Sequence, residues 1–306
     1  MATVMALSTR AASARSARGF FARIGRPIGL QLYTLGADAG KDLDATFAAV
    51  AEIGYRDIEL PTLYGHSPAE LRTAADKAGL AISSLHVPAS NLGGGGPTLS
   101  SSPAEIADVL NALGVKRAVM PFALVPEDFR PKTDGNIEAA IIEAFAGAGT
   151  DIWKRTAAFL NERAVTLQPH GIRLGYHNHN LEFAPIGNTT GWNILVSECD
   201  PVLVDFEVDI GWIATAGLDP ADFLAKYEGR VRQLHIKDVA ASNGVNFALS
   251  MQPAEVGAGK LDWARILPAA QAAGVQHYYV EQEPPFALPR IEAIRRSFAF
   301  LSGLRA

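Results

Sequence analysis

The chain has 306 residues, of which 48% are apolar and 19% are charged, a composition typical of a soluble globular protein with a large core. This composition excludes disordered, collagenous and coiled-coil proteins. The formal net charge is −5, so the basic surface that nucleic acid requires is missing and nucleic acid is not an expected partner. The single cysteine, Cys199, cannot form a disulfide within the chain. No stretch approaches the roughly 20 apolar residues of a membrane span, so no membrane association is expected.

Residues 1–26 differ from the rest of the chain because they contain five arginines and no acidic residue. We expect them to form a flexible N-terminal extension ahead of one catalytic domain over residues 27–306. A vestigial export signal is the alternative, although the apolar region that such a signal needs is absent. A cytoplasmic protein is therefore expected, with a periplasmic or exported one left open.

From residue 27 onward, helices and strands alternate in a repeated pattern. Apolar strands begin soon after glycines suited to the left-handed position that closes a helix, namely Gly54, Gly79, Gly114, Gly171 and Gly274. Helix starts repeat as well, because Ser67–Glu70 and Ser102–Glu105 both read as capping boxes with proline at the first helical position. The pattern predicts a series of βα units.

Eight strands are expected, at about residues 28–33, 57–60, 82–86, 118–121, 173–178, 202–208, 232–236 and 277–282, with a final helix over about 289–303. Eight βα units without a dinucleotide-binding glycine pattern favour an α/β protein with a single (β/α)8 TIM barrel over a doubly wound sheet. No linker interrupts the repeat, so one domain is expected.

Polar residues collect at the carboxyl ends of these strands, where TIM barrels carry their chemistry. The set comprises Glu59, His86, His177, His179, Glu182, Asp209, His235, Lys237 and Glu281. Converging imidazoles and carboxylates suit one divalent ion such as Mn²⁺, Co²⁺, Zn²⁺ or Fe²⁺, with Mg²⁺ as a further choice. Asp205, Glu207 and Asp209 alternate along one strand and cannot all bind one ion. One is expected to bind it, and the others to form hydrogen bonds or ion pairs.

Seven segments are similar to those of one known family. They are IGLQLYT (28–34), GYRDIEL (54–60), LGYHNHNLEF (174–183), VDFEVDIGWIATAGLDP (204–220), LHIKDV (234–239), EVGAGKLDW (255–263) and YYVEQE (278–283). Over about residues 27–304 the chain resembles the sugar phosphate isomerase/epimerase family, the xylose isomerase-like TIM barrels. The resemblance implies one divalent ion held by side chains from strands five to eight. It assigns His235, Glu281 and Asp209 as ligands, with Asp205 as a weaker candidate for the same strand as Asp209.

The fifth strand departs from the family pattern. Many relatives read Glu-Asn-His where this chain reads His177-Asn178-His179, and the resemblance implies that His177 is the fourth ligand. It replaces one of two glutamates that, in the ketose epimerases of the family, act as an acid/base pair on a metal-bound enediolate. Glu281 remains a candidate base, and His179 and Glu182 are expected to be alternative proton carriers.

Four further side chains are candidates for contact with substrate. Glu59 and His86 are expected to bind substrate hydroxyl groups, with structural salt bridges or hydrogen bonds as the alternative. Lys237 shares a strand face with His235 and is expected to bind a sugar oxygen or an enolate. Glu255 lies in a glycine-containing loop that is expected to fold over substrate.

Three functions follow from these residues. A divalent-metal-dependent isomerase or epimerase acting on a sugar or sugar derivative is the leading hypothesis, through proton transfer and an enediolate. A lyase or dehydratase acting on a keto sugar or a 3-keto glycoside is the alternative, which His177 favours. A non-catalytic sugar-binding barrel is the third, and the many acid/base residues at the strand ends disfavour it. The expected partner is a small carbohydrate, and a homo-oligomer is left open.

Overall fold

The computed structural model describes residues 19–91, 95–127, 129 and 137–306. Eight parallel strands form a closed barrel in the order β1-β12-β9-β8-β5-β4-β3-β2. They are β1 (Gly29–Gln31), β2 (Asp57–Leu60), β3 (Ala81–His86), β4 (Arg117–Met120), β5 (Arg173–His177), β8 (Val204–Asp209), β9 (Val231–Ile236) and β12 (His277–Val280). The predicted TIM barrel is therefore confirmed.

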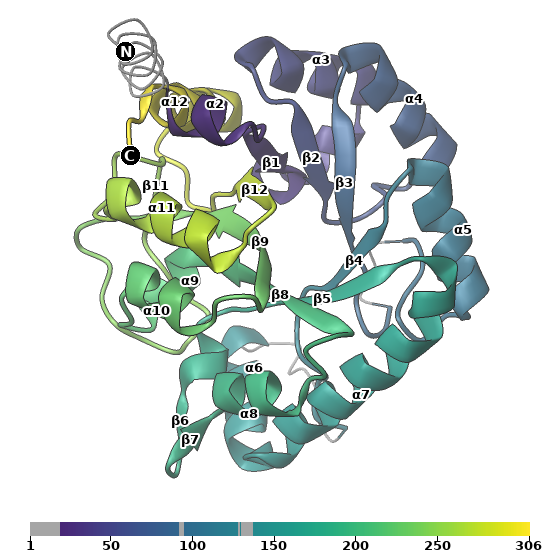
Figure 1. The fold of residues 1–306 in the computed structure, drawn as a ribbon, viewed down its shortest axis with the longest axis vertical. Coiled ribbons are helices and arrows are strands. Elements are labelled where there is room, and N and C mark those ends of the chain that lie inside the picture. Colours follow the sequence, from purple (N-terminus) through teal and green to yellow (C-terminus); the bar gives the residue numbers. More distant parts are fainter. Residues whose placement is uncertain (1–18, 92–94, 128, 130–136) are drawn as a thin grey trace, which may run out of the picture.

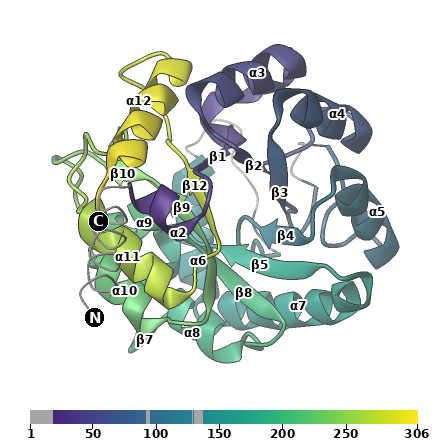
Figure 2. The ribbon, with the colours of Figure 1, turned by 45° about the horizontal axis from the view of Figure 1, so that its top comes forward.

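Helices surround the barrel, as Figures 1 and 2 show. They are α3 (Leu43–Ile53), α4 (Pro68–Ala78), α5 (Pro103–Leu113), α6 (Ile137–Ala148), α7 (Asp151–Leu167), α8 (Gly191–Glu198), α9 (Ile210–Thr215), α10 (Pro220–Lys226), α11 (Trp263–Ala273) and α12 (Arg290–Gly303). Two small antiparallel pairs lie outside the barrel, β6 (Pro185–Ile186) with β7 (Thr189–Thr190) and β10 (Asp238–Val239) with β11 (Pro253–Ala254). Within the described ranges, no helix has the length and apolar character needed to cross a lipid bilayer.

The local signals read from the sequence work as expected in α4. The Ser67 hydroxyl accepts a hydrogen bond from the Glu70 amide, and the Ser67 amide donates to the Glu70 carboxylate. Gly79 closes this helix with a φ of 69°, in the left-handed region that glycine adopts without strain. The first strand is shorter than expected, because the Gln31 side chain accepts a hydrogen bond from the Tyr33 amide and begins a 3₁₀ turn over Leu32–Leu35.

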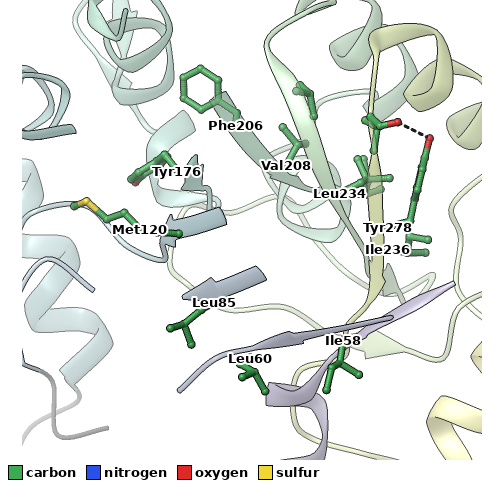
Figure 3. Packing of buried hydrophobic residues seen from close by; sticks show 14 of the residues in the cluster. Ile58, Leu60, Leu85, Met120, Tyr176, Phe206, Val208, Leu234, Ile236 and Tyr278 are labelled. Carbon is green, nitrogen blue, oxygen red and sulfur yellow. Dashed lines mark hydrogen bonds between the residues drawn. The ribbon is translucent and has the colours of Figure 1, made fainter. Parts of the chain in front are cut away.

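The main apolar core lies between the barrel and its helices. Ile58 and Leu60 of β2 and Phe206 and Val208 of β8 point toward this layer, where Figure 3 shows them with apolar residues of neighbouring strands. The alternate residues of the same strands, such as Glu59 and Glu207, are polar and fully buried. Because side chains alternate across a strand, the apolar outer face leaves the inside of the barrel to polar residues.

The packed part of the chain begins before residue 27. Residues 20–24, which we expected to belong to the flexible extension, form the short helix α2 (Phe20–Ile24) beside α12 (Figure 1). Phe20 is fully buried and its ring meets that of Tyr278 edge-on, with the ring centres 6.5 Å apart. These aromatic rings bury apolar surface, so residues 20–24 are part of the packed structure. Residues 1–18 of the expected extension lie outside the described residues.

Candidate active site

Neighbouring strands bring the polar residues together at the carboxyl end of the barrel. In the strand register, His177 of β5 is paired with Glu207 of β8, and Asp209 of β8 is paired with His235 of β9. Glu281 directly follows β12 and donates its backbone amide to the Ile236 carbonyl of β9. Residues that are far apart in the sequence therefore lie side by side on one inner face.

Four of these residues could hold a metal ion. His177, Asp209, His235 and Glu281 each offer one ligand atom, all lie within 4.8 Å of one another, and all four are buried. His235 Nδ1 lies 2.7 Å from Glu281 Oε2 and 3.7 Å from Asp209 Oδ2. They are the four ligands expected from the sequence. We call them the upper cluster, and their mixed nitrogen and oxygen donors suit a first-row divalent ion.

Lys237 lies against the upper cluster and is almost fully buried, with 1% of its side chain exposed. Its ammonium group lies 2.8 Å from both Asp209 Oδ2 and Glu281 Oε2, and 3.1 Å from Glu283 Oε1. Apart from this ion pair, Asp209 Oδ2 forms no hydrogen bond. Because a carboxylate oxygen has two lone pairs, the contact with Lys237 is compatible with a metal ion on the other side.

Two glutamates form a second layer beneath the upper cluster. Glu59 Oε2 lies 2.7 Å from His235 Nε2 and accepts a hydrogen bond from Gln31. Glu207 Oε2 lies 3.0 Å from His86 Nε2, 3.1 Å from His177 Nδ1 and 3.2 Å from His235 Nε2. Both carboxylates are fully buried. The two ring nitrogens of His235 thus face different layers, Nδ1 the upper cluster and Nε2 the lower carboxylates.

The charges in the lower layer shift one another's pKa values. Burial alone raises the pKa of Glu207, and the neighbouring Glu59 raises it further, but the contacts with His235 and His177 outweigh both and lower it to about 2. Burial lowers the pKa of His86, whereas Glu59 and Glu207 raise it to about 10. The protonated ring of His86 therefore balances part of the negative charge of the two carboxylates.

A cavity of about 420 Å³ opens beside the upper cluster. It is lined by Tyr33, Phe122, Glu138, His179, Trp212, Leu249, Ser250, Met251, Glu283, Pro284 and Pro285. Nδ1 of His179 is buried without a hydrogen-bond partner, and burial together with the charge of Lys237 lowers its pKa to about 3. His179 therefore presents a neutral imidazole at physiological pH. Glu283 approaches from the β12 side, where burial raises the pKa of its carboxyl group.

The remaining predicted residues lie elsewhere. Glu182 is buried, accepts hydrogen bonds from the Tyr176 hydroxyl at 2.6 Å and the His179 amide at 3.0 Å, and is not among the residues that line the cavity. Glu255 is half-buried, and its carboxylate accepts a hydrogen bond from the Gln282 side chain at 3.4 Å. Glu59 belongs to the lower layer, and His86 contacts both of its carboxylates. The expected contact of these two residues with substrate hydroxyls stays a prediction.

The family of the chain follows from comparison with known proteins. The family model described as "Xylose isomerase-like TIM barrel" matches residues 47–304. The chain belongs to this family. Residues 28–46 of this chain precede the matched range, but they contain β1 and part of α3 and complete the same barrel.

Several known proteins are similar to this chain. The inosose dehydratase of Lacticaseibacillus casei is 24% identical over 260 residues, which cover 77% of this chain and 81% of that protein. The inosose dehydratase of Clostridium botulinum (strain Alaska E43 / Type E3) is 25% identical over 281 residues and covers 84% and 89%. A solved sugar phosphate isomerase/epimerase from Parabacteroides distasonis ATCC 8503 has a TM-score of 0.69 and 24% identity, over 90% of this chain and 93% of that one. This structural likeness shows the shared fold.

The structure adds two candidate functional residues, Glu283 and Glu138, to those predicted from the sequence. Glu283 lines the cavity and contacts Lys237. Its position two residues after Glu281 was the signal that could have found it, because such spacing returns a side chain to the same face of an extended chain. Glu138 also lines the cavity, but it lies in α6, and its distance in sequence from every barrel strand leaves no comparable signal.

Proposed function

We propose that this chain is a divalent-metal-dependent lyase that removes a proton next to the carbonyl of a keto sugar or keto polyol and expels a group from the adjacent carbon. The observation that carries this proposal is the asymmetry of the cavity. The imidazole ring of His179, which follows β5, lines the cavity and has a buried Nδ1 atom without a hydrogen-bond partner, whereas Glu283, which follows β12, lines the cavity with a carboxyl group beside the Lys237 ammonium. A base on one side and proton donors on the other suit an elimination.

The upper cluster is the part of the chain that would hold the metal ion. Its two imidazoles and two carboxylates come from four neighbouring positions around the barrel, and the donor atoms lie within 4.8 Å of one another. When bound there, a divalent ion supplies Lewis-acid polarisation of a carbonyl oxygen. The donor set of His177, Asp209, His235 and Glu281 is the same as that implied by resemblance to the family.

The residues around the cavity have separate roles in this proposal. His179 accepts the proton that leaves carbon in this proposal, because its neutral ring lines the cavity. Glu283 donates a proton to the departing oxygen, and Lys237 orients Glu283 through the 3.1 Å contact. Trp212 and Phe122 provide apolar faces for the C–H groups of a sugar ring. An anionic substrate is disfavoured, because the ionisable groups among the described residues of the cavity wall, apart from His179 and Tyr33, are the acidic Glu138 and Glu283.

One further consideration supports elimination over the alternative. The similar curated proteins described above are named inosose dehydratase, and such a name denotes loss of water. Isomerase or epimerase chemistry is the second candidate, favoured by one observation. Glu281 and His179 follow different strands, β12 and β5, and could act on opposite faces of a substrate.

Product analysis in deuterated water separates the two reactions. The metal-loaded protein is incubated with keto polyols, keto sugars and 3-keto glycosides, and the mixtures are followed by NMR and mass spectrometry. We expect release of water or an aglycone together with an unsaturated ketone. Recovery of a sugar isomer that carries carbon-bound deuterium, without loss of any group, would support the isomerase instead. If neither change occurs with any of these substrate classes, both proposals fail.

A further inference from the structure

Glu207 lies at the centre of the contacts beneath the upper cluster. One carboxylate oxygen, Oε2, lies within 3.0–3.2 Å of three imidazole nitrogens, one each from His86, His177 and His235. The other oxygen, Oε1, accepts a hydrogen bond from the Gln233 side chain at 3.0 Å. The side chain is fully buried. Both oxygens are thus held by partners from other strands, and the carboxylate has a fixed position.

We infer that Glu207 is a positioning residue for the metal centre, which orients His177 by accepting a hydrogen bond from its Nδ1 atom and leaves Nε2 to bind the ion. This inference rests on the metal dependence in the proposed function. The ion then lies in the upper cluster rather than in the second possible donor group, formed by His86, His177, Glu207 and His235, and Glu207 acts on it through His177.

The physical reason is the chemistry of metal-bound histidine. A histidine that binds a metal through one ring nitrogen usually donates a hydrogen bond from the other, and the acceptor fixes both the tautomer and the ring orientation. A carboxylate acceptor also makes the imidazole a stronger donor to the metal. As a neutral ligand, His177 brings no charge of its own to the ion. The Glu207 carboxylate lies 3.1 Å from its Nδ1 atom and places a negative charge one ring away from the ion.

The other ring of the upper cluster follows the same arrangement. His235 directs Nδ1 toward Glu281 and Asp209, and its Nε2 lies 2.7 Å from Glu59. Each histidine of the upper cluster therefore has a carboxylate beneath it, Glu207 under His177 and Glu59 under His235. The strand register also shifts between Phe206 and Glu207 against β9. Such an irregularity can redirect a side chain, as bulges beside active sites do.

Asp205 is a matched control on the same strand. It lies two residues before Glu207, faces the barrel interior and is buried, with 4% of its surface exposed. Its carboxylate forms an ion pair with Arg117 at 2.9 Å, one layer further from the upper cluster. Asp205→Asn and Glu207→Gln thus each remove one buried negative charge from β8, and only the second removes a contact with His177.

The test measures binding of Co²⁺ to the full chain after removal of bound metal, by competition with a coloured chelator. We expect Glu207→Gln to weaken binding by about 10-fold to 100-fold, and Asp205→Asn to change it by no more than about twofold, as for an independent site. Glu207→Asp retains the charge but shortens the side chain, and we expect it to weaken binding as well. Wild-type affinity in both Glu207 variants would overturn the inference.

A double-mutant cycle separates orientation of His177 from a general effect of charge. In the His177→Ala background, the further loss caused by Glu207→Gln should be smaller than in the wild-type background, because the ring it orients is gone. An equally large loss in both backgrounds would overturn the inference and indicate charge alone. The cycle uses metal affinity, so it does not depend on knowing the substrate.

Nitrogen-15 NMR of histidine-labelled protein reads the tautomer directly and requires no substitution at Glu207. In the metal-loaded wild-type chain we expect His177 to carry its proton on Nδ1. A proton on Nε2 would overturn the inference while leaving metal binding and the proposed function intact. A wild-type chain that binds no divalent ion would overturn both, so the two failures are distinguishable.

Discussion

His235 and Glu281 are in direct contact at the boundary between β9 and β12, with Nδ1 of the imidazole 2.7 Å from Oε2 of the carboxylate. Both side chains are buried, and both belong to the upper cluster. A change at either residue therefore alters two of the four donor groups at once.

Glu281→Gln tests the upper cluster with a nearly isosteric change. The amide keeps the volume but loses the negative charge, so we expect metal content to fall and kcat/KM to drop by at least about 100-fold. The far-UV circular dichroism spectrum should stay that of the wild type. Glu292→Gln on the exposed face of α12, where the side chain is 44% exposed, is the control and should retain full activity. Retention of more than about a tenth of the activity would contradict the assignment.

His177, the last residue of β5, and His179, two residues further on, should give different defects. His177→Ala should weaken metal binding, because it removes a donor of the upper cluster. His179→Ala should leave the ion in place and mainly lower kcat, because the ring lines the cavity and is not a donor of the upper cluster. Elemental analysis and single-turnover kinetics measure the two effects. Metal loss in His179→Ala with full occupancy in His177→Ala would show that the two roles are reversed.

The strands and the upper cluster could be predicted because they depend on local pattern and strand order. Polar residues at period two, such as Asp209 after Glu207, mark the inward face of a strand. Closure of eight parallel strands then brings the ends of β5, β8, β9 and β12 together. The pattern therefore indicated where polar side chains gather, and the resemblance to the family indicated which four of them form the upper cluster.

The lower layer depends on contacts across the barrel that no local pattern contains. Glu59 and His235 are 176 residues apart and lie on strands that are not neighbours in the sheet, yet their side chains meet at 2.7 Å. The hydrogen bond between Gln233 and Glu59 joins the same two strands. Such contacts depend on the diameter of the barrel and the reach of each side chain, so sequence analysis left open whether Glu59 binds substrate or forms a structural salt bridge or hydrogen bond.

Lys237→Met should destabilise the metal-free protein. Lys237 is buried and neutralises Asp209, Glu281 and Glu283, and removing one partner of a buried ion pair costs about 3–5 kcal/mol. A divalent ion would neutralise two of these carboxylates, so saturating Mn²⁺ should restore part of the lost thermal stability. Lys77→Met on the exposed pair with Asp44 is the control, where we expect a loss below about 1 kcal/mol. An equal loss of melting temperature with and without Mn²⁺ would argue against this role for Lys237.

Glu182 should make the stability of the protein depend on pH between about 4.5 and 7. Burial raises the pKa of its carboxyl group from 4.5 to about 7, although hydrogen bonds from Tyr176 and the backbone oppose the shift. The folded state therefore binds the proton more tightly than the unfolded state does. The associated stabilisation is fully present below the unfolded pKa and is lost as the pH rises through the folded pKa. At about 1.4 kcal/mol per pKa unit, the loss is on the order of 3 kcal/mol.

Glu182→Gln removes the titrating group but keeps an oxygen that can accept the Tyr176 hydrogen bond, so its free energy of unfolding should change less between pH 5 and pH 8 than that of the wild type. Urea unfolding of both proteins across this range measures the difference, and parallel curves for the two would show that the carboxyl group of Glu182 is not the source.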